Sequence, residues 1–400
     1  MSDPQTPNWR KPEVLLIFMA AAMSIAFSVW QALLNNFVVE RAAFSGAEIG
    51  ILQSLREVPG FLAFTVVFVL LAVREQALAL LALGLTGLGV MLTGQFSTVW
   101  GLYATTLIMS TGFHYYETLQ QSLTLQWIGK NRLPEAMGRQ ISARSFAALF
   151  AFVIVWLGIE VFALDYAWLY LFAGGLTLAV AVSAWLVFPR FGQNTTQHKR
   201  IILRRRYWLY YALTFMGGAR RQIFIVFAAF MMVERFHFDA GDIALLFLIN
   251  HLLNIWMAPR IGRLISRWGE QRALTLEYLG LALIFAAYAF VSSPWLAAML
   301  YVADHLLFAM AIAIRSYFQK IADPADIAAT SGVAFSINHI AAVVIPVAFG
   351  LLWLASPAAV FLAGSAMALI SLVLARMIPD HPEPGCETVW QRTAAEAARI

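Results

Sequence analysis

Two stretches of sequence 194 residues apart decide the fold: Phe37–Leu52 reads FVVERAAFSGAEIGIL, and Met231–Leu246 reads MMVERFHFDAGDIALL. Six of the sixteen aligned positions are identical without a gap, including the Val-Glu-Arg triplets at 39–41 and 233–235. The same offset pairs Gly138 with Gly332 and Ser142 with Ser336. We therefore predict two structurally equivalent halves.

The composition excludes a water-soluble protein. Of the 400 residues, 61% are hydrophobic and 12% are charged, against about 45–50% apolar and 25% charged in a typical soluble domain. Apolar runs recur at lengths close to the ~20 residues that a membrane-spanning helix needs. We predict twelve such helices, at 14–39, 47–71, 76–95, 99–128, 137–163, 167–189, 207–234, 240–264, 272–291, 295–320, 329–354 and 357–378.

The basic residues predict the orientation of these helices. Twenty of the 27 Lys and Arg residues lie in the two termini, in the loops after helices 2, 4, 6, 8 and 10, or at the helix ends beside them. The opposite side holds only Arg41 and Arg235, and five arginines lie deeper inside the spans. Under the positive-inside rule, both termini are cytoplasmic. The net charge of +5 thus reflects membrane topology, and we expect no nucleic-acid partner.

The segment after the eighth predicted helix, Gly262-Arg263-Leu264-Ile265-Ser266-Arg267-Trp268-Gly269, resembles the cytoplasmic loop signature of the major facilitator superfamily. Ser266 stands where that family usually has an acid, and the loop after the second helix has lost the pattern. The resemblance spans about residues 14–378. It implies an all-α polytopic membrane protein whose two six-helix bundles are related by pseudo-twofold symmetry.

The expected domains follow from this resemblance. They are a cytoplasmic N-terminus (1–13), an N-terminal bundle (14–189), a basic cytoplasmic linker (190–206), a C-terminal bundle (207–378) and a cytoplasmic tail (379–400).

Arginines inside the predicted spans are the first candidates for binding a substrate. Arg220 and Arg221 lie halfway along the seventh helix, and Arg315 lies on the tenth. Helices 1, 4, 7 and 10 line the central cavity in the family, and guanidinium groups suit carboxylate or phosphate ligands. The alternative is that Arg220 or Arg221 pairs with Glu57, Glu117 or Asp304, or that Arg315 reaches toward the cytoplasm.

Helix 4 carries His114, Glu117 and Gln121 on one stripe, with Tyr115 beside it. A metal site would need matching ligands on other helices, so we expect none. We instead expect a substrate-binding wall formed by His114, Tyr115 and Gln121, together with Gln31 and Asn35 of helix 1.

Carboxyl groups inside the spans are the candidates for proton coupling, because an apolar environment favours their protonated form. The candidates are Glu117, Asp304 and Glu57. Counted against these three acids, the five arginines leave two positive charges. This surplus predicts an anionic substrate.

Helices 2, 5, 8 and 11 form the moving interfaces of the family, so their polar residues are candidate gating contacts. The alternative is static hydrogen bonding between helices. The candidate gating residues are Arg56, Arg144, His251, Asn338, His339, Gly262 and Arg267.

These observations predict a secondary active transporter that moves a small anionic organic solute by alternating access, coupled to protons. The sequence has no motif of a soluble enzyme and no phosphate-binding loop, so we expect neither catalysis nor a cofactor. The expected setting is the lipid bilayer of the bacterial inner membrane, with the chain as a monomer. The alternatives are an exporter of amphipathic or drug-like compounds, a lipid flippase and a sensor that transports nothing.

Overall fold

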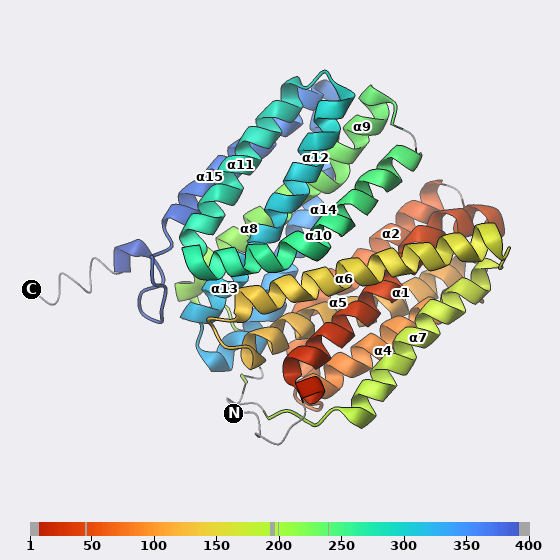
Figure 1. Ribbon diagram of the computed structural model, residues 1–400, viewed down its shortest axis with the longest axis horizontal. Coiled ribbons are helices and arrows are strands. Elements are labelled where there is room, and N and C mark those ends of the chain that lie inside the picture. Colours follow the sequence, from red (N-terminus) through yellow and green to blue (C-terminus); the bar gives the residue numbers. More distant parts are fainter. Residues whose placement is uncertain (1–7, 45, 193–196, 199, 239, 392–400) are drawn as a thin grey trace, which may run out of the picture. The chain divides into compact units, whose positions relative to one another are not determined.

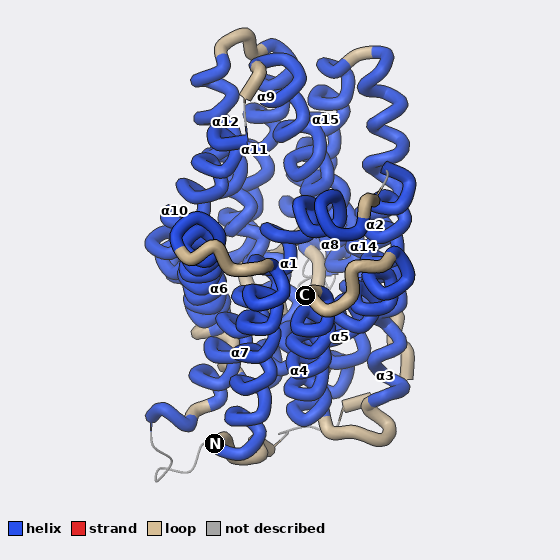
Figure 2. Tube along the Cα trace, turned by 90° about the vertical axis from the view of Figure 1, so that its right-hand side faces the viewer, coloured by secondary structure: helices blue, strands red, loops and turns tan. Residues whose placement is uncertain are grey.

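The computed structural model describes residues 8–44, 46–192, 197–198, 200–238 and 240–391. Within these ranges the chain is built from helices joined by short loops, and Figure 2 shows no strand among them. The only β-type pairing in the described residues is an isolated bridge between Glu383 and Cys386.

Six helical segments make up the first half of the sequence. The second segment is divided by a 3-10 turn, Leu62–Thr65, and the fifth ends in a π-helical turn, Leu157–Val161. The helices are α1 Pro12–Ala42, α2 Gly46–Phe61, α3 Val66–Val69, α4 Glu75–Thr93, α5 Val99–Trp127, α6 Leu133–Trp156 and α7 Tyr166–Val187.

Six more segments form the second half, and two of them are interrupted. A π-helical turn, Ile223–Ala228, separates α8 from α9, and a 3-10 turn, Ala309–Ala311, separates α12 from α13. The helices are α8 Trp208–Gln222, α9 Ala229–Phe236, α10 Ala240–Trp268, α11 Glu270–Phe290, α12 Pro294–Phe308, α13 Ile312–Ile321, α14 Ile327–Ala355 and α15 Pro357–Arg376.

All twelve predicted spans are helical, which confirms the predicted fold class. The largest differences lie at two ends. The fifth segment begins at Leu133 rather than 137, because the neighbouring Pro134 fits a first helical turn, where its missing N–H costs nothing. The eighth continues to Trp268 rather than 264 and stops at Gly269, whose φ of +84° is readily adopted only by glycine.

Eight of the described helical segments are long and apolar enough to cross a membrane. α5 is not among these eight, although it contains 29 residues. His114 and Glu117 lie in the middle of α5 and lower its mean hydropathy.

The chain divides into two compact units. Unit 1 comprises Met1–Ile128, Arg139–Ile201 and Ala328–Ser336, and unit 2 comprises Gly129–Gly138, Ile202–Ile327 and Ile337–Ile400. The units follow the two halves of the sequence except for two short segments at the beginnings of α6 and α14.

Glycines allow close helix packing inside unit 1, where α4 lies between α5 and α7. A Cβ added at Gly89 would lie 2.4 Å from the backbone nitrogen of Met109, and one at Gly174 would lie 2.3 Å from the carbonyl oxygen of Gly87. Such close backbone approach is a usual source of helix association in membranes.

Unit 2 packs α11 along α15, as Figure 1 shows. Ser365 on α15 donates a hydrogen bond of 2.8 Å to the carbonyl oxygen of Ala282 on α11. The beginning of α6 also belongs to this unit and crosses α10 at two glycines. A Cβ at Gly138 would lie 2.3 Å from the Ala258 carbonyl oxygen, and one at Gly262 would lie 2.2 Å from that of Pro134.

Candidate functional site

Arg220 and Arg221 point in different directions from the last turn of α8. Adjacent residues of an α-helix diverge by about 100°, and here the side chain of Arg220 is fully buried whereas Arg221 is exposed. The helix changes to a π-helical turn two residues later, at Ile223. Single-turn π-helices often mark functional sites.

Arg220, predicted as a substrate ligand, makes its contacts with other helices of unit 2. Its Nη2 atom lies 3.9 Å from the Glu277 carboxylate, its Nη1 atom donates to Ser371, and its guanidinium lies 4.3 Å from the Tyr278 ring centre. These partners come from α11 and α15. Arg220 thus lies inside the helix packing of unit 2, with an ion-pair partner that the sequence reasoning did not include.

Arg221 belongs to a second cluster, formed with polar side chains of α10 and α12. Nδ2 of Asn254 lies 2.7 Å from Nε2 of His305. His251 and Arg221 also lie close enough to His305 to influence it electrostatically. His251, predicted as a gating residue, therefore lies close to a predicted substrate ligand. We call Arg221, His251, Asn254 and His305 the cationic cluster.

Aromatic rings border this cluster. The Phe224 ring lies 6.0 Å from the His305 ring and stacks on Tyr301 at 4.6 Å, centre to centre. The cluster thus offers one guanidinium, two imidazole rings, an amide and apolar ring faces.

Asp304 and Arg315 have different environments, although their spacing predicts a shared helix face. Asp304 on α12 is fully buried and Arg315 on α13 is exposed. The 3-10 turn at Ala309–Ala311 lies between them, and its ~120° per residue changes the angle between their side chains.

In unit 1, Arg56 and Glu57 of α2 form an ion pair of 2.7 Å. Ser110 of α5 donates to the carbonyl oxygen of Arg56 and lies 2.9 Å from Nδ1 of His114. A carboxylate oxygen of Glu57 and a ring nitrogen of His114 lie within 4.8 Å. The structure therefore brings three predicted site residues together, with His114 buried.

A second ion pair of unit 1 joins α5 to α6. Nη1 of Arg144 lies 2.8 Å from the carboxylate of Glu117, and the hydroxyl of Tyr116 is buried beside them. Glu117, predicted to carry a proton, thus has a close cationic partner. Arg144, predicted to act in gating, joins two helices of the same half.

The remaining predicted ligands of unit 1 are scattered. The Tyr115 hydroxyl lies 2.6 Å from the hydroxyl of Thr65. Gln31 is exposed and Gln121 is half-buried. The side chain of Asn35 lies outside the described part of the structure.

The other predicted gating residues lie in unit 2. Nδ2 of Asn338 is 3.5 Å from the carbonyl oxygen of Thr214, and His339 is half-buried on α14. Gly262 lies at the crossing of α10 with α6, where Nη1 of Arg263 is 3.6 Å from Glu135. Arg267 is exposed.

Two functional groups were missed by the sequence reasoning. Glu277 is fully buried on α11 and raises the number of deep acids from three to four. The surplus of two positive charges was therefore wrong, because five arginines against four acids leave one. The sequence could have revealed Glu277, because it is an acid inside the predicted span 272–291.

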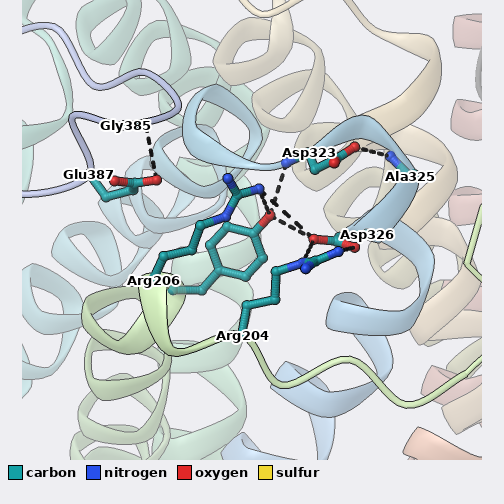
Figure 3. Close-up of polar contacts among 8 residues, drawn as sticks. Arg204, Arg206, Asp323, Ala325, Asp326, Gly385 and Glu387 are labelled. Atoms are coloured by element: carbon teal, nitrogen blue, oxygen red, sulfur yellow. Dashed lines mark hydrogen bonds and ion pairs between the residues drawn. The ribbon is translucent and has the colours of Figure 1, made fainter.

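The second missed group ties the linker to the beginning of α14 (Figure 3). Arg204 donates to both oxygens of the buried Asp326 carboxylate, with Nη2 at 2.9 Å from Oδ1. The Tyr207 hydroxyl donates to Oδ2 at 2.9 Å and accepts from Arg206 at 2.7 Å. These hydrogen bonds raise the pKa of the Arg204 guanidinium above its ordinary value.

A surface pocket of about 440 Å³ in unit 2 lies apart from these polar groups. Its lining is mainly apolar and aromatic and includes Met231, Tyr288, Trp353 and Phe361. Arg235 also lines the pocket, but no residue of the cationic cluster does.

A model of the major facilitator superfamily matches residues 14–346 of the sequence. The chain belongs to the major facilitator superfamily. Members of this superfamily are transporters rather than enzymes, and the chain is accordingly a multi-pass membrane protein built for alternating-access transport of small molecules. A comparison with curated protein sequences found no match.

Solved structures of other superfamily members share the fold. The human organic anion transporter MFSD10 is 15% identical, with a TM-score of 0.73 over 92% of this chain and 100% of that one. FucP in its outward conformation is 14% identical, with a TM-score of 0.76 over 91% and 98%. A bacterial homologue of the iron transporter ferroportin is 10% identical, with a TM-score of 0.72 over 91% and 98%.

Proposed function

We propose that this superfamily member is a proton-coupled secondary transporter of a small anionic organic solute. The observation that carries the proposal is the cationic cluster of unit 2, in which an exposed arginine lies close to two histidines and an asparagine. A planar guanidinium binds a carboxylate or phosphate through two parallel hydrogen bonds. Asn254 adds an amide donor that fixes orientation, and Phe224 adds an apolar face for the organic part of the solute.

The break in the helix at this point supports the same site. Arg221 lies one residue before the end of α8, and α12 changes to a 3-10 turn four residues after His305. In secondary transporters, substrate sites are typically formed where membrane helices are discontinuous. Two of the three helices that supply basic groups to the cluster, α8 and α12, are interrupted next to it.

Further proposed contacts come from residues whose roles rest on the sequence. Arg315 is the second proposed cationic ligand, and Gln31, Asn35, His114, Tyr115 and Gln121 are proposed polar ligands. We further propose that the protein acts as a monomer in the bacterial inner membrane, with both termini in the cytoplasm.

Structural neighbours agree with this function only in part. Three neighbours are an organic anion transporter, a fucose:proton symporter and a homologue of an iron transporter. At 10–15% identity these neighbours establish the fold only. The substrate class must therefore be inferred from the residues of this chain. The cationic cluster favours the anion.

The test is a thermal-shift panel on detergent-purified protein with benzoate, succinate, glucose 6-phosphate and the lipophilic cation tetraphenylphosphonium. We expect at least one anion to raise the unfolding temperature of the wild type. In Arg221→Gln that shift should be lost, whereas Arg272→Gln, which removes an exposed arginine of α11, should keep it.

Other outcomes contradict the anion proposal. Stabilisation by the lipophilic cation alone would favour an exporter of amphipathic compounds, and stabilisation by phospholipid alone would favour a flippase. A stabilising anion that is not transported in proteoliposomes would indicate a sensor.

A further inference from the structure

Three ionisable side chains lie fully buried next to the cationic cluster and have no role in it. Arg220 of α8, Glu277 of α11 and Asp304 of α12 are all 0% exposed. An isolated charge is very costly inside a membrane protein, so such groups are expected to balance one another. We call these three residues the buried triad.

Charge balance within the triad starts from Arg220, because a guanidinium stays protonated in proteins. The nearest acid is Glu277, at 3.9 Å. Tyr278 presents its ring face to the guanidinium, and Ser371 accepts from it. Arg220 and Glu277 together form a neutral pair.

Asp304 has no comparable partner. Its carboxyl oxygens, like those of Glu277, neither accept nor donate a hydrogen bond within the described part of the chain, and no ion pair like that of Glu277 joins it to Arg220 there. The charged groups that act on it are Arg220 and Glu277, and the titratable groups facing it are the hydroxyls of Tyr288 and Tyr301. An ionised Asp304 would therefore leave the triad with a net charge of −1 and no hydrogen bonds to stabilise it.

We propose that the buried triad is a proton-binding site that holds one proton, carried by Asp304. A proton fits better than a metal cation, because the guanidinium of Arg220 lies beside the carboxylate oxygens that a metal would need and repels it. Release of the proton requires a change in packing that brings Asp304 nearer to Arg220 or to water.

The triad is connected to the cationic cluster by sequence neighbours on two helices. α8 supplies Arg220 to the triad and Arg221 to the cluster, and α12 supplies Asp304 to the triad and His305 to the cluster. An anion that moves Arg221 or His305 also moves the residue bonded to it. Rotation of either helix would therefore change the environment of the proton. This coupling role rests on the proposed function, whereas the proton site itself does not.

The test counts buried carboxylic acids by infrared spectroscopy of purified protein, using the C=O stretch of protonated carboxyl groups and its shift in D₂O. At neutral pH we expect the wild type to show one such group from the triad. Asp304→Asn should lose it. Glu277→Gln should lose it as well, because Asp304 then ionises to balance Arg220. Arg220→Met should double it, because both acids then need a proton.

Control variants keep the result interpretable. Glu270→Gln removes another buried acid, whose carboxylate has its own cation, Lys320, at 2.6 Å, and should leave the band unchanged. Asp304→Glu should keep a band at a shifted frequency, which guards against misfolding of the amide variant. A band that persists in both Asp304→Asn and Glu277→Gln overturns the proposal. So does a band that appears only when Na⁺ is replaced by K⁺, since Na⁺ would then be the occupant.

A transport assay separates this proposal from the proposed function. In proteoliposomes, a pH gradient should accelerate uptake of a stabilising anion by the wild type and have no effect on uptake by Asp304→Asn. Equal acceleration in both overturns the coupling role while the anion transporter stands. If no anion is transported but the infrared bands change as expected, the proton site stands and the anion function fails.

Discussion

Ion pairs between neighbouring helices define the polar interior at the scale of single residues. Arg144 and Glu117 hold α6 to α5 at 2.8 Å, with side chains 31% and 19% exposed. Partial exposure lowers the strength of such a pair, but removing one partner still leaves the other charge poorly solvated. Both members are therefore needed together.

This pair gives a prediction for a double-mutant cycle. We expect Arg144→Gln and Glu117→Gln each to lower the unfolding temperature, and the double variant to be less affected than the sum of the two. The coupling energy should lie between about 0.5 and 3 kcal/mol. Thermal unfolding of the four detergent-purified proteins measures it, and strictly additive effects would show that the pair contributes nothing.

The partners of Arg220 and Arg221 could not be predicted from the sequence. The divergence of Arg220 and Arg221 follows from helix geometry alone. Which of the two faces the interior depends on α11 and α15, which supply Glu277 and Ser371. Single-residue spacing does not reveal such partners, since they lie 57 and 151 positions away in the sequence.

At the scale of elements, apolar run length predicted all twelve helical segments, because the bilayer sets the length of each. The interruptions were not predicted. Residues 223–228 read Ile-Phe-Ile-Val-Phe-Ala, with no proline or glycine. The π-helical turn there depends on how α8 and α9 pack, which an apolar run does not encode.

The crossing of α6 and α10 gives a prediction about helix packing. Alanine at Gly138 or Gly262 would place a methyl group within 2.3 Å of a backbone carbonyl oxygen, which cannot move like a side chain. We expect either variant to separate the two helices and lower the unfolding temperature. Gly175→Ala is the matched control, because a Cβ there meets nothing within 4 Å. A Gly138→Ala protein as stable as Gly175→Ala would contradict the described crossing.

The junction of the linker with α14 gives a second prediction at this scale. Asp326→Asn keeps the shape of the side chain but removes the charge that Arg204 and Tyr207 contact. A hydrogen bond to a charged group contributes about 1.5–3 kcal/mol, so the unfolding temperature should fall. The exposed Asp380 provides the control, Asp380→Asn, which should have little effect.

Between pH 6 and pH 8, the titration of Arg204 adds no pH dependence to the stability of this junction. Its pKa is raised in the folded protein. Its contribution to stability is therefore fully present below its unfolded pKa and is lost only as pH rises through the folded value. An effect of Asp326→Asn that disappeared between pH 6 and pH 8 would argue against this assignment.

At the scale of the whole molecule, the 194-residue repeat reappears in equivalent contacts. Gly138 lies against Ala258 and Pro259 inside unit 2, and Gly332 lies near Ala63 and Phe64 inside unit 1. Phe64 and Ala258 are themselves 194 positions apart. The repeat thus preserves glycines at two equivalent helix crossings, whereas the buried triad belongs to unit 2 alone. The repeat therefore accounts for the helix packing that both units share. The buried triad lies where the two halves of the sequence differ.

The distribution of basic residues leads to a prediction about the orientation of the whole chain. Cys386 is the only cysteine in the sequence, and it is partly exposed after α15. If both termini are cytoplasmic, a membrane-impermeant maleimide should label it in inside-out vesicles and leave it unlabelled in intact spheroplasts. Ser97 is exposed in the loop between α4 and α5, on the opposite predicted side. Ser97→Cys combined with Cys386→Ser should therefore give the reverse pattern. Labelling of Cys386 in intact spheroplasts would mean that the lysines and arginines do not set the orientation here.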